Sequence, residues 1–173
     1  KEITAALPQA KISLAFYAGT QHVLLNGMDV SADIRTPEIS MAASDVAAMP
    51  AVRRFLFDLQ LSIAKKENIL MDGRDIGTVV LPQANLKIFL TATPEERARR
   101  RHLELSEKPG CPSYEEILAD IIQRDAQDCN RATAPLRQAA DAVLVDSTAL
   151  SQDEVVETLL ALCKERLGLK CTM

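Results

Sequence analysis

From residue 69 to the C-terminus, short apolar runs alternate with longer amphipathic segments. Three of these runs predict buried strands: Ile69–Asp72, Leu86–Leu90 and Ala142–Asp146. The segments between and after them carry apolar residues at helical spacing. Strands that alternate with helices favour an α/β domain, with a mostly parallel sheet that is covered on both faces. No other feature of the chain constrains the fold as strongly.

Two predicted helices in this part begin at a residue that can cap them. Thr93 precedes Pro94 and a glutamate, and Ser113 is followed within three residues by glutamate. A hydroxyl at this position accepts a hydrogen bond from a backbone N–H that has no partner within the helix. We therefore expect helices to begin directly after these two residues, and a closing amphipathic helix over 151–167.

Residues 11–30 follow a different pattern, which predicts an antiparallel hairpin. Apolar and polar residues alternate over 12–16, and turn residues follow at Ala18-Gly19 and again at Asn26-Gly27. Thr36-Pro37 and Met49-Pro50 then each predict the start of a helix. Beyond the hairpin, Asp29 and Asp33 are interpreted as surface charges, and Arg35 as either a surface or a site residue.

Composition excludes several classes of function. The net charge of −4 argues against bulk binding to nucleic acid or to an anionic membrane, and no apolar run is long enough to span a bilayer. The four cysteines include no CxxC pair, so we expect free thiols and a cytoplasmic protein. Arginine makes up 12 of the 20 basic residues, and its planar fork suits phosphate or carboxylate. A local anion site therefore remains possible.

The tetrad Asp72-Gly73-Arg74-Asp75 closes the first predicted strand of the α/β part. Charges at the end of a buried strand are costly unless they meet partners or a ligand. Such a mixed set suggests a pocket for a phosphorylated molecule with further hydrogen-bonding groups. The two carboxylates alone would instead suit magnesium, although the arginine between them argues against a dedicated metal site.

Charged residues continue the apolar face of the helix predicted from Tyr114 to about Asn130. The apolar stripe consists of Ile117, Leu118, Ile121 and Ile122. Steps of three and four residues then lead to Arg124, Asp125, Asp128 and Arg131. These positions predict the wall of a functional cleft. The alternative is a solvated helix end, in which Arg124 and Asp128 form an ion pair within the helix.

Four arginines lie on the helix after Thr93. Arg97 and Arg101 are one turn apart and suit a polyphosphate, whereas Arg99 and Arg100 fit a solvated basic face at least as well. The polar, proline-rich segment 106–112 follows. It suggests a mobile lid that would exclude water from a phosphate reaction, or else a plain connecting loop.

Six blocks of the sequence together resemble the bacterial cytidylate kinases, in the order and spacing of that family. They cover residues 29–39, 42–48, 71–80, 87–92, 95–101 and 124–131. The resemblance implies a P-loop nucleoside monophosphate kinase fold, with a parallel core, a lid and an antiparallel insertion for the monophosphate. It implies transfer of the γ-phosphoryl group of ATP to CMP or dCMP, with Mg²⁺ as cofactor, in a protein that is a monomer.

The resemblance also assigns residues to the acceptor nucleotide. Ser44, Arg53 and Asp72 would surround the cytosine, a base edge that both donates and accepts hydrogen bonds. Arg74 and Arg131 would hold the CMP phosphate, and Arg131 would also act in catalysis.

Further residues are implied for the sugar, the reaction centre and ATP. Asp128 would bind the sugar hydroxyls, helped by Arg124, unless Arg124 acts on the transferred phosphoryl group and is catalytic in that sense. Asp75 would belong to the phosphoryl-transfer centre. Arg97 and Arg101 would lie on the ATP side, and no metal ligand is expected within the chain.

One part of the family pattern is missing from this sequence. Such kinases begin with a strand and a G-x-x-x-x-G-K-[ST] loop, and no such loop occurs here. The expectation is therefore a chain that lacks its N-terminal segment and has little kinase activity alone. Residues 1–68 would hold the rest of a core helix and the CMP-binding insertion. Residues 69–173 would form the core, with the lid at about 102–131.

Two other functions are alternatives to the kinase. The first is a non-catalytic module that binds a cytidine nucleotide. The second is a metal-dependent hydrolase built on Asp72, Asp75, Asp125 and Asp128, which the interleaved arginines disfavour.

Overall fold

The computed structural model describes most of the chain and divides it into two compact units, Lys1–Ile69 and Leu70–Met173. The described residues are 2–36, 39, 42–43, 46–47, 49–106, 110–130, 132 and 134–168. Among them, no helix is both long enough and apolar enough to cross a lipid bilayer.

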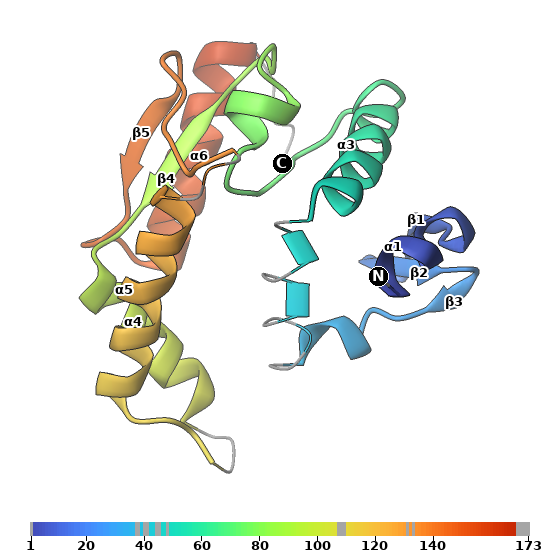
Figure 1. The fold of residues 1–173 in the computed structure, drawn as a ribbon. Helices are drawn as coiled ribbons and strands as arrows, with labels where there is room; N and C mark the ends of the chain where they lie inside the picture. Colours follow the sequence, from blue (N-terminus) through green and yellow to red (C-terminus); the bar gives the residue numbers. More distant parts are fainter. Residues whose placement is uncertain are drawn as a thin grey trace. The chain divides into compact units, whose positions relative to one another are not determined.

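The first unit contains a three-stranded antiparallel sheet in the order β1 (Ile12–Tyr17), β2 (Thr20–Leu25) and β3 (Met28–Asp29) (Figure 1). The two connecting turns lie at Ala18-Gly19 and Asn26-Gly27, where all four residues have positive φ. Tight hairpin turns require this backbone geometry, which glycine and asparagine adopt at low cost. The predicted hairpin is confirmed, and the short β3 is an addition to it.

The carboxylate of Asp29, which the sequence suggested was a plain surface charge, organises this sheet. It accepts hydrogen bonds from the Tyr17 hydroxyl at 2.9 Å and from the Ser31 amide at 2.9 Å. Its second oxygen also lies 2.7 Å from Nδ1 of His22, whose ring stacks on Tyr17. Hydrogen bonds from Ser31, Tyr17 and His22 hold the pKa of Asp29 far below its usual value.

Helical segments complete the first unit. They are α1 (Glu2–Ala6), the 3₁₀ turns η1 (Leu7–Gln9) and η2 (Asp33–Arg35), and α3 (Pro50–Ala64). The helix predicted at Met49-Pro50 is confirmed, with Val52 buried on α3. The start predicted at Thr36-Pro37 lies partly outside the described residues.

The second unit is built on two parallel strands, β4 (Ile88–Thr91) and β5 (Val143–Asp146), with Ile88 opposite Val143. Its helices are α4 (Pro94–Leu105), α5 (Tyr114–Asn130) and α6 (Gln152–Leu167). The helices α4 and α5 begin where the capping residues predicted, and the closing helix predicted over 151–167 is confirmed as α6. Thr93 accepts a hydrogen bond from the Glu96 amide, and Ser151 forms a capping box with Glu154. A parallel sheet with helices confirms the mixed α/β class.

Two expectations for this unit are wrong. Ile69–Asp72 is not a strand, because no strand of the described residues pairs with it and an isolated strand has no ladder of hydrogen bonds. The sheet is also not covered on both faces, since the side chains of Leu90 and Leu144 are 52% and 56% exposed. An unpredicted π-helical turn, η3 (Ile76–Val80), follows the tetrad.

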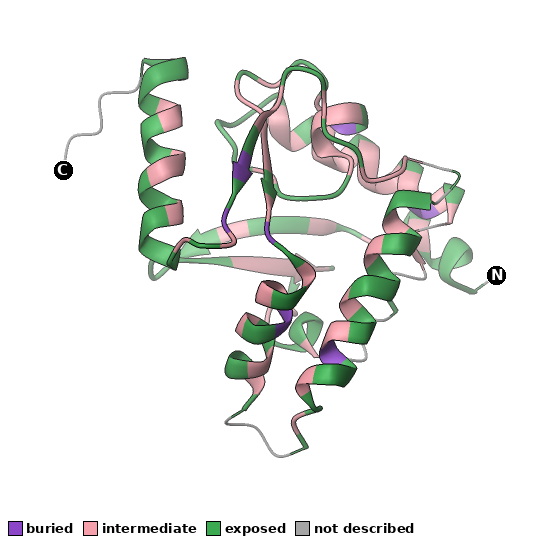
Figure 2. Cartoon of the chain, turned by 90° about the vertical axis from the view of Figure 1, so that its left-hand side faces the viewer, coloured by how far each residue is buried: buried purple, intermediate pink, exposed green. Residues whose placement is uncertain are grey.

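A small core surrounds the strands of the second unit. Its buried apolar residues are Val80, Ala92, Ala98, Ile117 and Val145 (Figure 2). Ser147 is buried with them and donates a hydrogen bond from its hydroxyl to the Thr91 carbonyl. Arg100 donates to the same hydroxyl and to the Leu150 carbonyl. It is therefore a brace between α4 and the segment after β5, not part of a solvated basic face.

Candidate functional site

A cavity of about 370 Å³ lies along β4 in the second unit. One wall is formed by the turn that holds Asp72 and Arg74, and another by Arg97 and Asp125 from α4 and α5. These charged residues come from three separate segments of the sequence, and each belongs to a pattern that predicted a site. The fold thus brings together charges of both signs around a single cavity.

Arg74 and Asp128 form the first long-range ion pair of this region. Nε of Arg74 donates to Oδ2 of Asp128 at 3.0 Å across a separation of 54 residues. The Asp128 side chain is 14% exposed and that of Arg74 is 44% exposed. Asp128 therefore pairs with the tetrad, which lies far from it in sequence. The guanidinium of Arg74 stays accessible to an anion.

Arg97 and Asp125 form the second such pair, which joins α4 to α5. The guanidinium donates through NH1 to Oδ1 at 3.1 Å and through NH2 to the other carboxylate oxygen. These bonds hold the pKa of Asp125 below its usual value against the opposing effect of partial burial. The charges of Arg74 and Arg124 act in the same direction.

The other expected site residues of the second unit occupy varied surroundings. Asp75 is half-buried and caps η3, where its carbonyl accepts from the Val79 amide at 2.8 Å. Arg124 is exposed on α5. Arg101 is 49% exposed and pairs with Glu104 on the surface of α4 at 2.8 Å.

Three expected residues belong elsewhere or are not described. Arg53 lies on α3 in the first unit, and its NH1 is 3.5 Å from the Ala47 carbonyl. Ser44 and Arg131 lie outside the described residues, so their predicted roles rest on the sequence alone.

Lys87 also lines the cavity, and the sequence carried no signal for its role. Its side chain is 8% exposed, and Nζ donates to both carboxylate oxygens of Asp141 at 2.7 and 2.8 Å. The aliphatic part of Lys87 packs against Gly77, where an added Cβ would lie 3.4 Å from Cδ. Lys87 therefore packs against the turn that follows the tetrad, and its amino group is engaged in an ion pair.

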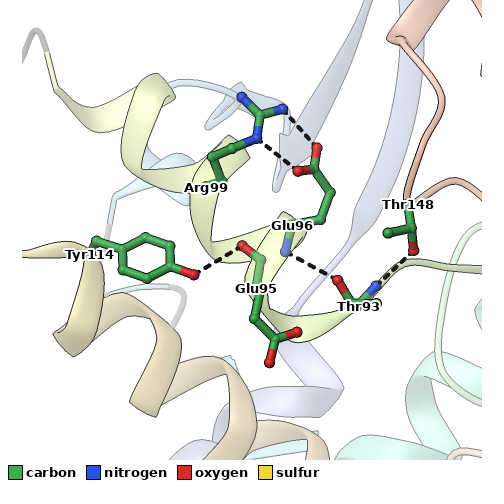
Figure 3. Close-up of a pocket in the computed structure, with 6 residues that line it drawn as sticks. All are labelled: Thr93, Glu95, Glu96, Arg99, Tyr114 and Thr148. Atoms are coloured by element: carbon green, nitrogen blue, oxygen red, sulfur yellow. Dashed lines mark hydrogen bonds and ion pairs between the residues drawn. The ribbon is translucent and has the colours of Figure 1, made fainter.

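A second hollow, of about 420 Å³, lies between the starts of α4 and α5 (Figure 3). Its polar groups bond to one another. The Thr93 amide donates to the Thr148 hydroxyl at 3.0 Å, and Arg99 pairs with Glu96. None of the residues expected to bind a ligand lines it. We therefore take the cavity along β4 as the candidate site.

The carboxylates of the cavity do not form a metal site of their own. Within the described part of the chain, no group of three or more histidine, cysteine, aspartate or glutamate residues is placed to hold a metal ion. Asp125 and Asp128 are each bonded to an arginine instead. This pairing disfavours the metal-dependent hydrolase, whose four aspartates would have to share one ion.

Comparison with known proteins gives consistent matches. The family model for cytidylate kinase matches residues 2–165. The cytidylate kinase of Caldicellulosiruptor saccharolyticus is 49% identical over 97% of this chain and 74% of its own length. That of Thermosipho melanesiensis is 46% identical over 98% of this chain and 76% of its own length. The cytidylate kinase of Saccharophagus degradans is 55% identical over 86% of this chain and 66% of its own length.

Proposed function

This chain belongs to the cytidylate kinase family of phosphotransferases, and we propose that it carries the acceptor site for transfer of the γ-phosphoryl group of ATP to CMP or dCMP. The main support, beside the family match, is the cavity along β4, which joins Asp72 and Arg74 to Arg97 and Asp125. In phosphoryl transfer a protein mainly positions groups and neutralises charge. A cavity walled by arginines suits that task.

On the acceptor side, Arg74 would hold the phosphate of CMP together with Arg131. The exposure of the Arg74 guanidinium supports this role, since one of its nitrogens is oriented by Asp128 while the group stays accessible. A charge-assisted and oriented contact of this kind binds phosphate strongly. Asp128 would hold the sugar hydroxyls, with Arg124 beside it on α5.

Asp72, Ser44 and Arg53 would each contribute to the recognition of cytosine, as the resemblance implies. Cytosine presents a donor and an acceptor on one edge, so a carboxylate and a polar or cationic side chain complement it. Such groups would distinguish cytosine from uracil, which has an acceptor oxygen where cytosine has a donor amino group and a donor N–H where cytosine has an acceptor ring nitrogen.

The phosphoryl-transfer centre would include Asp75, with Arg97 and Arg101 on the side of ATP. Arg101 is held only at the surface by Glu104, an exposed pair that is weak enough to exchange for a phosphate. Mg²⁺ would arrive with ATP and be held by its phosphates, because Asp125 and Asp128 are each paired with an arginine.

Steady-state kinetics of Arg74→Ala test the proposal. We expect kcat/KM for CMP to fall by about 10²-fold, with a smaller change for ATP, because a charged contact to phosphate is lost. The matched control is Arg99→Ala, which removes an exposed arginine of α4 that pairs with Glu96 outside the cavity. CMP kinetics and CMP affinity that are both unchanged in Arg74→Ala would contradict the proposal.

A further inference from the structure

Asp125 is a residue of the cavity wall to which the proposed reaction assigns no role. Three guanidinium groups act on its carboxylate: Arg97 through hydrogen bonds, and Arg74 and Arg124 through their charge. Arg74 and Arg97 are proposed to meet nucleotide phosphates, and Arg124 is proposed to lie beside the sugar. Asp125 thus supplies negative charge to a cluster of cations that would otherwise repel one another.

All three nitrogens of the Arg97 guanidinium donate hydrogen bonds to protein groups. Nε donates to the Ala92 carbonyl at 3.1 Å, and the two terminal nitrogens form a fork with the Asp125 carboxylate. A two-pronged pair combined with a backbone bond leaves the planar guanidinium a single orientation. Ala92 lies directly after β4 and is buried. The hydrogen bond to its carbonyl therefore fixes the Arg97 guanidinium relative to the core of the second unit.

The position of this pair links the two sides of the proposed reaction. Arg97 is expected on the ATP side, and 36% of its side chain is exposed. Asp125 lies on α5, the helix that also carries Arg124 and Asp128 for the acceptor. The pair therefore connects the end of β4 to the helix that holds the acceptor residues.

We propose that Asp125 is a positioning residue. It sets the orientation of Arg97 before nucleotide binds, and through Arg97 it holds α5 in place beside the end of β4. The inference rests on the proposed kinase function and adds a residue to it. Ordering an arginine in advance removes the entropic cost of ordering it during the reaction. Asp125 would act through Arg97, without touching a substrate itself.

A purely structural role for Asp125 makes a different prediction, because it would be independent of Arg97. A double-mutant cycle on kcat/KM for ATP, at saturating CMP, separates the two. We expect Asp125→Asn to lower kcat/KM by about tenfold, as second partners of functional groups do. In an Arg97→Ala background the same substitution should change kcat/KM by less than about twofold.

Two further variants complete the test. Asp125→Glu keeps the charge and should recover part of the lost activity. Asp120→Asn removes a carboxylate from an exposed position of the same helix and should leave the kinetics unchanged. The melting temperatures of all variants show whether the folded fraction has changed.

Each outcome decides one claim. An equal loss on Asp125→Asn with and without Arg97, or no loss in the unmodified background, overturns the positioning role while the kinase function stands. Failure of the unmodified protein to bind CMP in calorimetry overturns the proposed function instead. In that case the cycle of melting temperatures still tests the pair, since additive losses from the two substitutions would show that the residues are not coupled.

Discussion

The carboxylates of Asp29 and Asp125 are both surrounded by donors, but the donors come from different distances along the chain. The hydrogen-bond partners of Asp29 lie no more than 12 positions away, in or next to the hairpin to which it belongs. Asp125 draws on Arg97, 28 positions away, and the neighbouring Arg74–Asp128 pair spans 54. Local hydrogen bonds stabilise a local element, whereas long-range pairs of opposite charge assemble a cavity.

The kind of donor differs as well. Two of the groups around Asp29 are hydroxyls and one is a backbone amide, which together satisfy a carboxylate at the surface. The groups around Asp125 are guanidiniums, which also bind phosphate. The first arrangement is complete in itself. The second retains cations that a nucleotide can engage.

The largest loss of activity is expected for a substitution at Arg131. Substitution by alanine should weaken CMP binding and lower kcat/KM by about 10²-fold or more, because a charge-assisted phosphate contact is lost. Steady-state kinetics with varied CMP provide the measurement. If the CMP kinetics of Arg131→Ala equal those of the unmodified protein, the phosphate site has been assigned to the wrong residues.

A smaller effect is expected for Ser44, which the resemblance assigns to the base. Ser44→Ala should reduce the preference for CMP over UMP by about tenfold, the equivalent of one hydrogen bond. The ratio of kcat/KM for the two nucleotides measures it, and Ser44→Thr is the control because it keeps the hydroxyl. An unaltered ratio would remove Ser44 from the recognition of cytosine.

The smallest effect on activity is expected at Asp29. Asp29→Asn should lower the melting temperature by a few degrees and leave turnover nearly unchanged, because an amide nitrogen cannot accept the bonds from Tyr17 and His22. Asp33→Asn, in the neighbouring turn η2, serves as the control. A large loss of turnover without a change in melting would place Asp29 in the site.

The stability that Asp29 contributes should also depend on pH. Its pKa is lowered in the folded protein, so the contribution is fully present above the unfolded value of about 3.8 and is lost as pH falls toward the folded value. Melting curves below pH 4 should therefore converge for the unmodified protein and Asp29→Asn. A constant difference down to strongly acid pH would contradict this assignment.

Much of the local structure could be predicted from the sequence, since it depends on neighbouring residues. Thr93, Ser113 and Ser151 specify helix starts through hydrogen bonds within three residues, and Asn26-Gly27 specifies a turn through its backbone preference. The charged continuation of the α5 stripe likewise indicated a cleft wall.

The partners of the charged residues could not be predicted in the same way. Helical spacing places Asp125 and Asp128 on one face, but it does not reveal that Arg97 and Arg74 meet them. The apolar run Ile69–Asp72 was misleading for a related reason, since a strand exists only when another strand pairs with it. Lys87 is ordinary in sequence, and its ion pair with Asp141 joins residues 54 positions apart.

The central claim is that guanidinium and carboxylate groups from distant segments converge on a pyrimidine mononucleotide. A crystal structure of the protein with bound CMP tests it most directly. The account predicts the phosphate of CMP within hydrogen-bond distance of the Arg74 guanidinium, in the cavity along β4, with the sugar beside Asp128. A CMP molecule held elsewhere, for example in the hollow beside Thr93 and Tyr114, with Arg74 still bonded only to protein, would contradict it.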